Sequence, residues 1–101
     1  MNDSVSPLVI SPTESGFAVC GEIDAHTSPS IREAIEQTDL EHIVIDMSGV
    51  DFVDSSGLRV LIEMHQLKQT TGGSLMLARP SAVVSRLLAI SGVDDYLIVA
   101  D

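Results

Sequence analysis

Short apolar segments of strand type alternate with amphipathic helical segments along the whole chain, and this order constrains the fold more than any other feature. Residues 42–47 (His-Ile-Val-Ile-Asp-Met) form a β-branched run that predicts a buried central strand. Strands that alternate with helices imply right-handed crossovers and a largely parallel sheet. The order strand–strand–helix–strand–helix–strand–helix–strand therefore predicts an α/β domain, with a mixed, mostly parallel sheet packed with about three to four helices.

The predicted strands are separated by segments with turn or loop composition. Residues 11–16 (Ser-Pro-Thr-Glu-Ser-Gly) follow the first strand, so we expect an antiparallel hairpin at one edge of the sheet. Residues 48–54, after the central strand, are expected to form a loop. The strands themselves are predicted at 5–10, 17–23, 42–47, 75–78 and 96–100.

Three helices are predicted from signals at their ends. The Ser-Pro pair at 28–29 indicates an N-cap serine followed by a proline at the first helical position. A second helix is expected to begin near the serines at 55–56 and to stop at the two glycines 72–73, which suit a left-handed C-terminal cap. The Pro-Ser pair at 80–81 opens a third helix, and Gly92 ends it.

The overall charge narrows the classes of partner. The 101 residues carry a formal net charge of −10, which disfavours nucleic-acid backbones and anionic membranes, because both are bound through Lys and Arg. A protein partner with a basic face would be attracted instead. The chain has one cysteine, Cys20, and its first residues do not resemble a signal peptide, so we expect a cytoplasmic protein. Apolar neighbours favour Cys20 as a buried small hydrophobe.

Residues 54–58 (Asp-Ser-Ser-Gly-Leu) are the sharpest local feature of the sequence. They lie just beyond the carboxyl end of a central strand, where open α/β sheets place their functional loops. Either serine can cap the following helix. Gly57 leaves room for the backbone of another protein to approach. From the spacing alone, an ordinary helix cap is the more common explanation of such a segment.

The run from residue 43 to 58 closely resembles the signature of the STAS domain family, whose name covers sulfate transporters and anti-sigma factor antagonists. Residues 21–24 (Gly-Glu-Ile-Asp) resemble a second family segment. Residues 87–93 resemble the family's last helix before the final strand. The three segments occur in family order and spacing, so the resemblance covers essentially the whole chain as one domain, 1–101.

The resemblance also implies a role for the Asp-Ser-Ser-Gly segment. In the antagonist branch, the first serine after the aspartate is phosphorylated by a partner kinase that is also the anti-sigma factor, and that serine corresponds to Ser55. The unmodified chain is then expected to bind the anti-sigma factor and free its sigma factor. Arg59 stands where small residues are frequent in the family, and it could pair with a partner acid or with the phosphoserine. The residues expected at the partner surface are Asp24, Asp54, Ser56, Gly57 and Arg59.

An enzyme is the main rival class, and the sequence argues against it. The Gly-x-Ser-x-Gly motif of hydrolases and the P-loop motif are both absent, and the histidines at 26, 42 and 65 are scattered. A receiver domain would need an acidic pair after the first strand, where Ser-Pro-Thr stands instead. Asp46, Asp51 and Asp54 are expected to be solvated loop acids rather than metal ligands. We therefore predict no catalytic residue, metal or cofactor.

One alternative remains within the same fold. The domain could be a partner-binding or scaffold module that no kinase modifies, or a sensor of a nucleotide or another small ligand.

Overall fold

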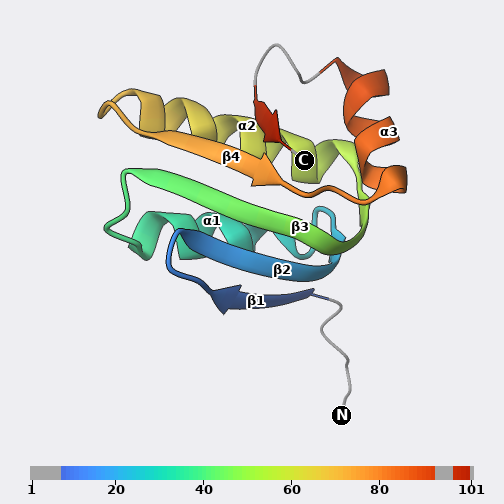
Figure 1. Cartoon of the computed structure of the whole chain (residues 1–101), viewed down its shortest axis with the longest axis horizontal. Coiled ribbons are helices and arrows are strands. Elements are labelled where there is room, and N and C mark those ends of the chain that lie inside the picture. Colours follow the sequence, from blue (N-terminus) through green and yellow to red (C-terminus); the bar gives the residue numbers. More distant parts are fainter. Residues whose placement is uncertain (1–7, 93–96, 101) are drawn as a thin grey trace.

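The computed structural model describes residues 8–92 and 97–100, which form one sheet and three helices (Figure 1). The strand order is β1-β2-β3-β4-β5. The pair β1–β2 is antiparallel and the other pairs are parallel, so the predicted mixed, mostly parallel α/β fold is confirmed. Residues 5–7 and 96, where the first and last strands were expected to begin, lie outside the described residues. The elements are β1 (Leu8–Pro12), β2 (Gly16–Ile23), α1 (Ser28–Gln37), β3 (His42–Val53), α2 (Ser55–Gln69), β4 (Ser74–Ala78), α3 (Ala82–Ser91) and β5 (Ile98–Ala100).

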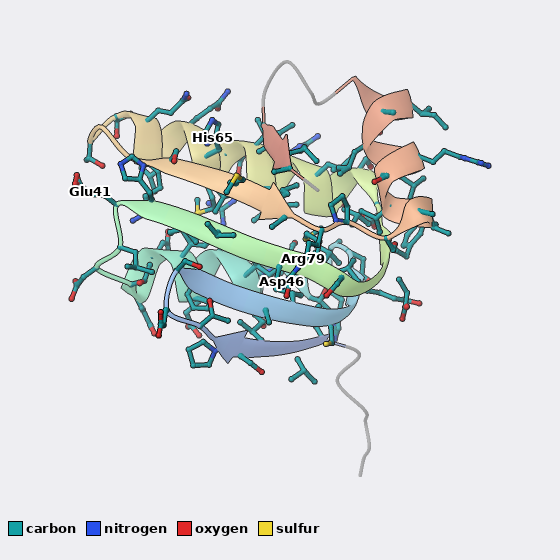
Figure 2. All side chains as sticks on the ribbon, in the orientation of Figure 1. Glu41, Asp46, His65 and Arg79 are labelled. Carbon is teal, nitrogen blue, oxygen red and sulfur yellow. The ribbon has the colours of Figure 1, made fainter. Side chains whose placement is uncertain are left out.

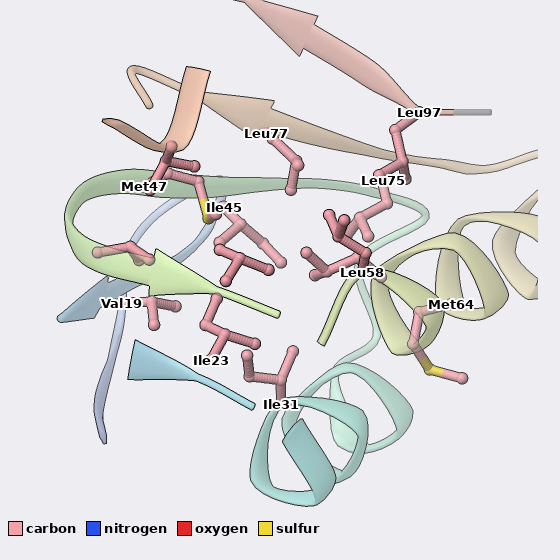
Figure 3. Close-up of a cluster of buried hydrophobic side chains, with 14 of the residues drawn as sticks. Val19, Ile23, Ile31, Ile45, Met47, Leu58, Met64, Leu75, Leu77 and Leu97 are labelled. Carbon is pink, nitrogen blue, oxygen red and sulfur yellow. The ribbon is translucent and has the colours of Figure 1, made fainter. Parts of the chain in front are cut away.

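The strands bury alternate side chains against the helices. Along β3, Ile43, Ile45 and Met47 are fully buried, whereas the intervening Val44 and Asp46 are half-buried. This period of two is that of a strand with one face on the core. In Figure 1 the sheet lies in front of α1 and α2, and Figure 3 shows their apolar side chains meeting those of the strands.

The central strand is longer than predicted. Residues 48–53 were expected in a loop, but β3 continues to Val53 and pairs with β2 as far as Ile23. Gly49 lies within this strand because Cys20 of β2 packs closely against it. A Cβ at position 49 would lie 2.5 Å from the Cys20 sulfur, so the space that a side chain would need is already filled. The pairing of β2 with β3 contains two register shifts, one between Ala18 and Cys20 and one between Gly21 and Glu22. The extension carries the chain directly to Asp54, without an intervening loop.

Cys20 is exposed, which corrects the expectation that it is buried. Its neighbour Val19 points into the core, so Cys20 points to the opposite face of the sheet. Val9, its register partner on β1, is exposed too. The sequence showed an apolar run here but not which of its two faces the helices cover.

The end signals predicted for α3 are confirmed, whereas the N-caps of α1 and α2 differ from the predicted residues. Ser81 caps α3 by accepting the N–H of Val84 at 3.3 Å, and Gly92 closes the helix with φ 71°, as predicted. Gly72 adopts φ 83° just after α2. For α1 the N-cap is Thr27 rather than Ser28. None of the helices in residues 8–92 and 97–100 combines the length and apolar composition needed to cross a bilayer.

Candidate functional site

The carboxyl ends of β2 and β3 meet at one edge of the sheet. Ile23 pairs with Val53, and the N–H of Asp54 donates to the carbonyl oxygen of Ile23 at 3.0 Å. The segments that follow these strands, starting at Asp24 and Asp54, therefore begin side by side. The structure thus brings two of the sequence-predicted residues to the same edge, where parallel sheets commonly carry their sites.

Asp54, and not a serine, caps α2. Its Oδ1 accepts the N–H of Gly57 at 2.8 Å, which corrects the expectation that Ser55 or Ser56 has this role. Ser55 is the first residue of the helix and is exposed, whereas Ser56 is half-buried. Neither serine hydroxyl makes a hydrogen bond within the described part of the chain. The Ser55 hydroxyl is therefore exposed and has no hydrogen-bond partner among the described residues that a covalent modification would displace.

Gly57 is buried against its own chain, so its predicted role of admitting a partner's backbone is corrected. A Cβ at this position would lie 2.6 Å from Cγ2 and 2.8 Å from the carbonyl oxygen of Ile23. Ordinary Cβ contacts do not come this close. The absent side chain lets the first turn of α2 pack directly on the end of β2, which fixes the position of the neighbouring Ser55.

Asp24 shapes the loop between β2 and α1. Its Oδ1 accepts the N–H groups of His26 at 2.9 Å and Thr27 at 3.0 Å. The hydrogen bond from Thr27 is the main reason that the pKa of Asp24 lies below its usual range. The Thr27 hydroxyl donates to the carbonyl oxygen of Glu22 at 2.8 Å and accepts the N–H of Asp24 at 3.0 Å, so it is held in the loop and does not cap α1. One carboxylate oxygen of Asp24 is thus used in hydrogen bonds that hold its own loop.

A groove of about 320 Å³ runs along α2 from Ser55 to the C-terminal end of α3. Leu58 and Ile62 contribute apolar surface, and Arg59 and Ser55 border it on the exposed side of α2. The Arg59 side chain makes no hydrogen bond or ion pair with any described residue. The residues that line the groove are Ser55, Leu58, Arg59, Ile62, Glu63 and Ser91.

The sequence did not reveal this groove or the exposure of an aromatic side chain in β3. Phe52, next to the last residue of that strand, is 43 % exposed. The spacing of Leu58 and Ile62 was a usable signal for an apolar stripe on α2. The approach of Ser91 from α3 had no signal in the sequence, because it depends on how α3 packs.

Asp46, Asp51 and Asp54 do not converge on a metal site. Asp46 lies in β3 and pairs with Arg79, as Figure 2 shows, so it is not the solvated loop acid that was expected. The N–H of Ser48, together with Arg79, lowers the pKa of Asp46 to about 2. Asp51 is also part of β3, while Asp54 caps α2. Within residues 8–92 and 97–100, no group of three or more His, Cys, Asp or Glu side chains could hold a metal ion.

The three histidines have separate surroundings. His65 is buried between α2 and β4, and its Nδ1 accepts the N–H of Leu75 at 3.0 Å (Figure 2). Burial lowers the pKa of His65, which favours the neutral ring that this hydrogen bond requires. His42 bonds to Ser74 through Nδ1 at 2.9 Å, and His26 is exposed in the loop before α1. None of the hydrogen bonds that these rings make involves Ser55.

Comparison with known proteins identifies the family. A family model described as STAS domain matches residues 9–101. The chain belongs to the STAS domain family. This STAS domain is 36% identical over 85 residues to the anti-sigma F factor antagonist of Paenibacillus polymyxa, an alignment that covers 80% of this chain and 73% of the relative. It therefore falls in the anti-sigma factor antagonist branch of the family.

Solved structures share the fold of this STAS domain. The anti-sigma factor antagonist SpoIIAA in its unphosphorylated form matches with a TM-score of 0.70 and 23% identity, covering 93% of this chain and 88% of that one. SpoIIAA of Bacillus in the phosphorylated form matches with a TM-score of 0.63 and 23% identity, covering 93% and 91%. The same fold is thus known for an antagonist both with and without a phosphate.

Proposed function

We propose that the chain is an anti-sigma factor antagonist that binds an anti-sigma factor of the serine-kinase type, frees a sigma factor, and is switched off by phosphorylation at Ser55. The observation that carries the proposal is the state of Ser55. It is exposed at the first position of α2, and its hydroxyl is unbonded because Asp54 supplies the helix cap. A kinase can therefore modify Ser55 without removing a contact that the fold needs.

The physics favours a switch at the interface over a switch that unfolds the domain. A phosphate on Ser55 adds about −1.5 to −2 charges. At a helix N-terminus it meets favourably oriented amide dipoles, so the fold tolerates it. A partner surface packed against the neutral serine would have to desolvate that anion, at a cost of several kcal/mol. The loss then falls on binding rather than on folding.

The proposed contact surface surrounds Ser55. Asp24 begins the loop after β2, Asp54 caps α2 at the same edge of the sheet, and Ser56 follows in the first turn of α2. Arg59 and the groove continue the surface along the helix. Gly57 contributes indirectly, since its packing on Ile23 sets the position of the turn.

The proposal assigns a binding role and no catalytic one. Anti-sigma factor antagonists are non-enzymatic regulators. It also places the chain in the cytoplasm, where a single unpaired cysteine stays reduced.

The direct test combines phosphorylation with binding. The chain is incubated with ATP and candidate anti-sigma kinases, its intact mass is measured, and the phosphate is mapped. We expect one phosphate on the wild-type chain and on the Ser56→Ala variant, and none on Ser55→Ala. Binding without modification would instead favour an unmodified scaffold module, and a phosphate on Ser56 would show that the assigned site is wrong.

A further inference from the structure

Arg59 and Ser55 are neighbours on the surface of α2. They are four residues apart, a spacing that brings Cβ atoms to within about 5–6 Å on a helix. Both side chains are exposed, and both line the same groove. A phosphate lengthens the serine side chain toward solvent, and the arginine side chain is long enough to meet it.

The Arg59 guanidinium forms no ion pair or hydrogen bond with another group of the described structure. Glu63 lies four residues after Arg59, at the spacing that would suit an ion pair within the helix. Glu63 pairs instead with Arg32 of α1. Of the four arginine side chains, those of Arg59 and Arg86 make no hydrogen bond or ion pair within residues 8–92 and 97–100, and Arg86 does not line the groove.

The chemistry of the two groups suits a pair. The guanidinium is planar and always charged, and its N–H donors match phosphate oxygens in a bidentate arrangement. An anion four residues before a cation is also the more favourable order along a helix. We propose that Arg59 holds the phosphate on Ser55 within the same helix, an inference that rests on the proposed function for the identity of the modified serine.

The pair changes what a partner meets at the groove. In the unmodified chain, Arg59 presents a free cation on a strongly acidic protein, available to a carboxylate of the partner. In the phosphorylated chain the same guanidinium is bound to the phosphate, across the exposed side of the groove. Phosphorylation therefore adds an anion and withdraws a cation in one step.

The test measures the phosphate itself, so it needs neither kinase nor partner. Phosphoserine is installed at position 55 by genetic encoding, and its second pKa, ordinarily about 6, is followed by phosphorus NMR. An adjacent cation favours the dianion and lowers this pKa. We expect Arg59→Gln to raise it by about 0.15–0.4 pH units, the value that corresponds to one helical ion pair. Arg86→Gln is the matched control and is expected to leave it unchanged.

Two outcomes would overturn the inference. If the phosphate has the same pKa in the wild-type chain and in Arg59→Gln, then no pair forms. Equal shifts in Arg59→Gln and Arg86→Gln would show a general effect of net charge. Both arginines are exposed, so the variants are expected to fold, and their far-ultraviolet circular dichroism checks this. Failure of the proposed function would appear separately, as loss of partner binding or of kinase modification, without altering this pKa difference.

Discussion

Replacing Gly57 by alanine tests the close contact that positions the start of α2. The new Cβ would lie 2.6 Å from Cγ2 and 2.8 Å from the carbonyl oxygen of Ile23. That oxygen also accepts the N–H of Asp54 at 3.0 Å, so it cannot shift without weakening a hydrogen bond. Overpacking of this kind costs about 1–3 kcal/mol. Alanine's higher helix propensity returns at most about 1 kcal/mol. Because the Ile23 backbone cannot move away, the upper part of that cost, about 2–3 kcal/mol, applies, and we expect a net loss of about 1–2 kcal/mol in the free energy of unfolding.

Thermal unfolding followed by circular dichroism measures this loss. Each kcal/mol corresponds to about 4–8 °C in Tm for a domain of this size. Ser56→Ala is the matched control, because Ser56 precedes Gly57 and its hydroxyl makes no hydrogen bond with described residues. It is expected to change the stability by no more than about 0.5 kcal/mol. A Gly57→Ala variant that melts at or above the wild-type temperature would refute the argument that the end of β2 is fixed against α2.

Three further perturbations follow from the contacts described above. Asp54→Ala removes the cap of α2 and should cost about 0.5–2 kcal/mol, whereas Asp54→Asn should keep most of it; equal losses in urea unfolding would contradict the capping role. The folded-state pKa of His65 lies below 6.5, so the unfolded chain binds its proton first, and stability should fall as pH drops below 6.5. His65→Gln should lose that component, and an unchanged pH profile would count against it. The pKa of Asp46 is about 2, so its contribution is present above pH 3.8 and lost as pH falls towards 2. Asp46→Asn should flatten acid unfolding in that range.

The parts of the fold that could be predicted are those with local signals. The start of α3 at the Pro-Ser pair and its end at Gly92 were each predicted from residues that cap that end of the helix, and both predictions are confirmed. The order of strands and helices was likewise predictable, because it follows from hydrophobic periods along the chain. The prediction of Ser28 as the N-cap was wrong by one residue, because Ser28 is the first residue of α1 and Thr27 is its N-cap.

The other errors have a different cause, apart from the cap of α2, because they depend on contacts between distant segments. Residues 48–53 have the composition of a loop, but pairing with β2 keeps them in β3. Cys20 belongs to an apolar run, yet its exposure is decided by which face of the sheet the helices cover. Gly57 was assigned to a partner because nothing in the local sequence indicates Ile23 beside it. The groove at Ser55 likewise needs α3 in place.

The measurement that tests the central claim most directly is a titration of the anti-sigma partner against the chain with and without phosphate on Ser55. A loss of several kcal/mol at the interface corresponds to a decrease in affinity of at least about a hundredfold. Ser55→Ala should bind like the unmodified chain, because Ser55 caps nothing, and Ser55→Asp should show a partial loss. Equal affinities for the phosphorylated and unmodified chains, with both folded, would contradict the account.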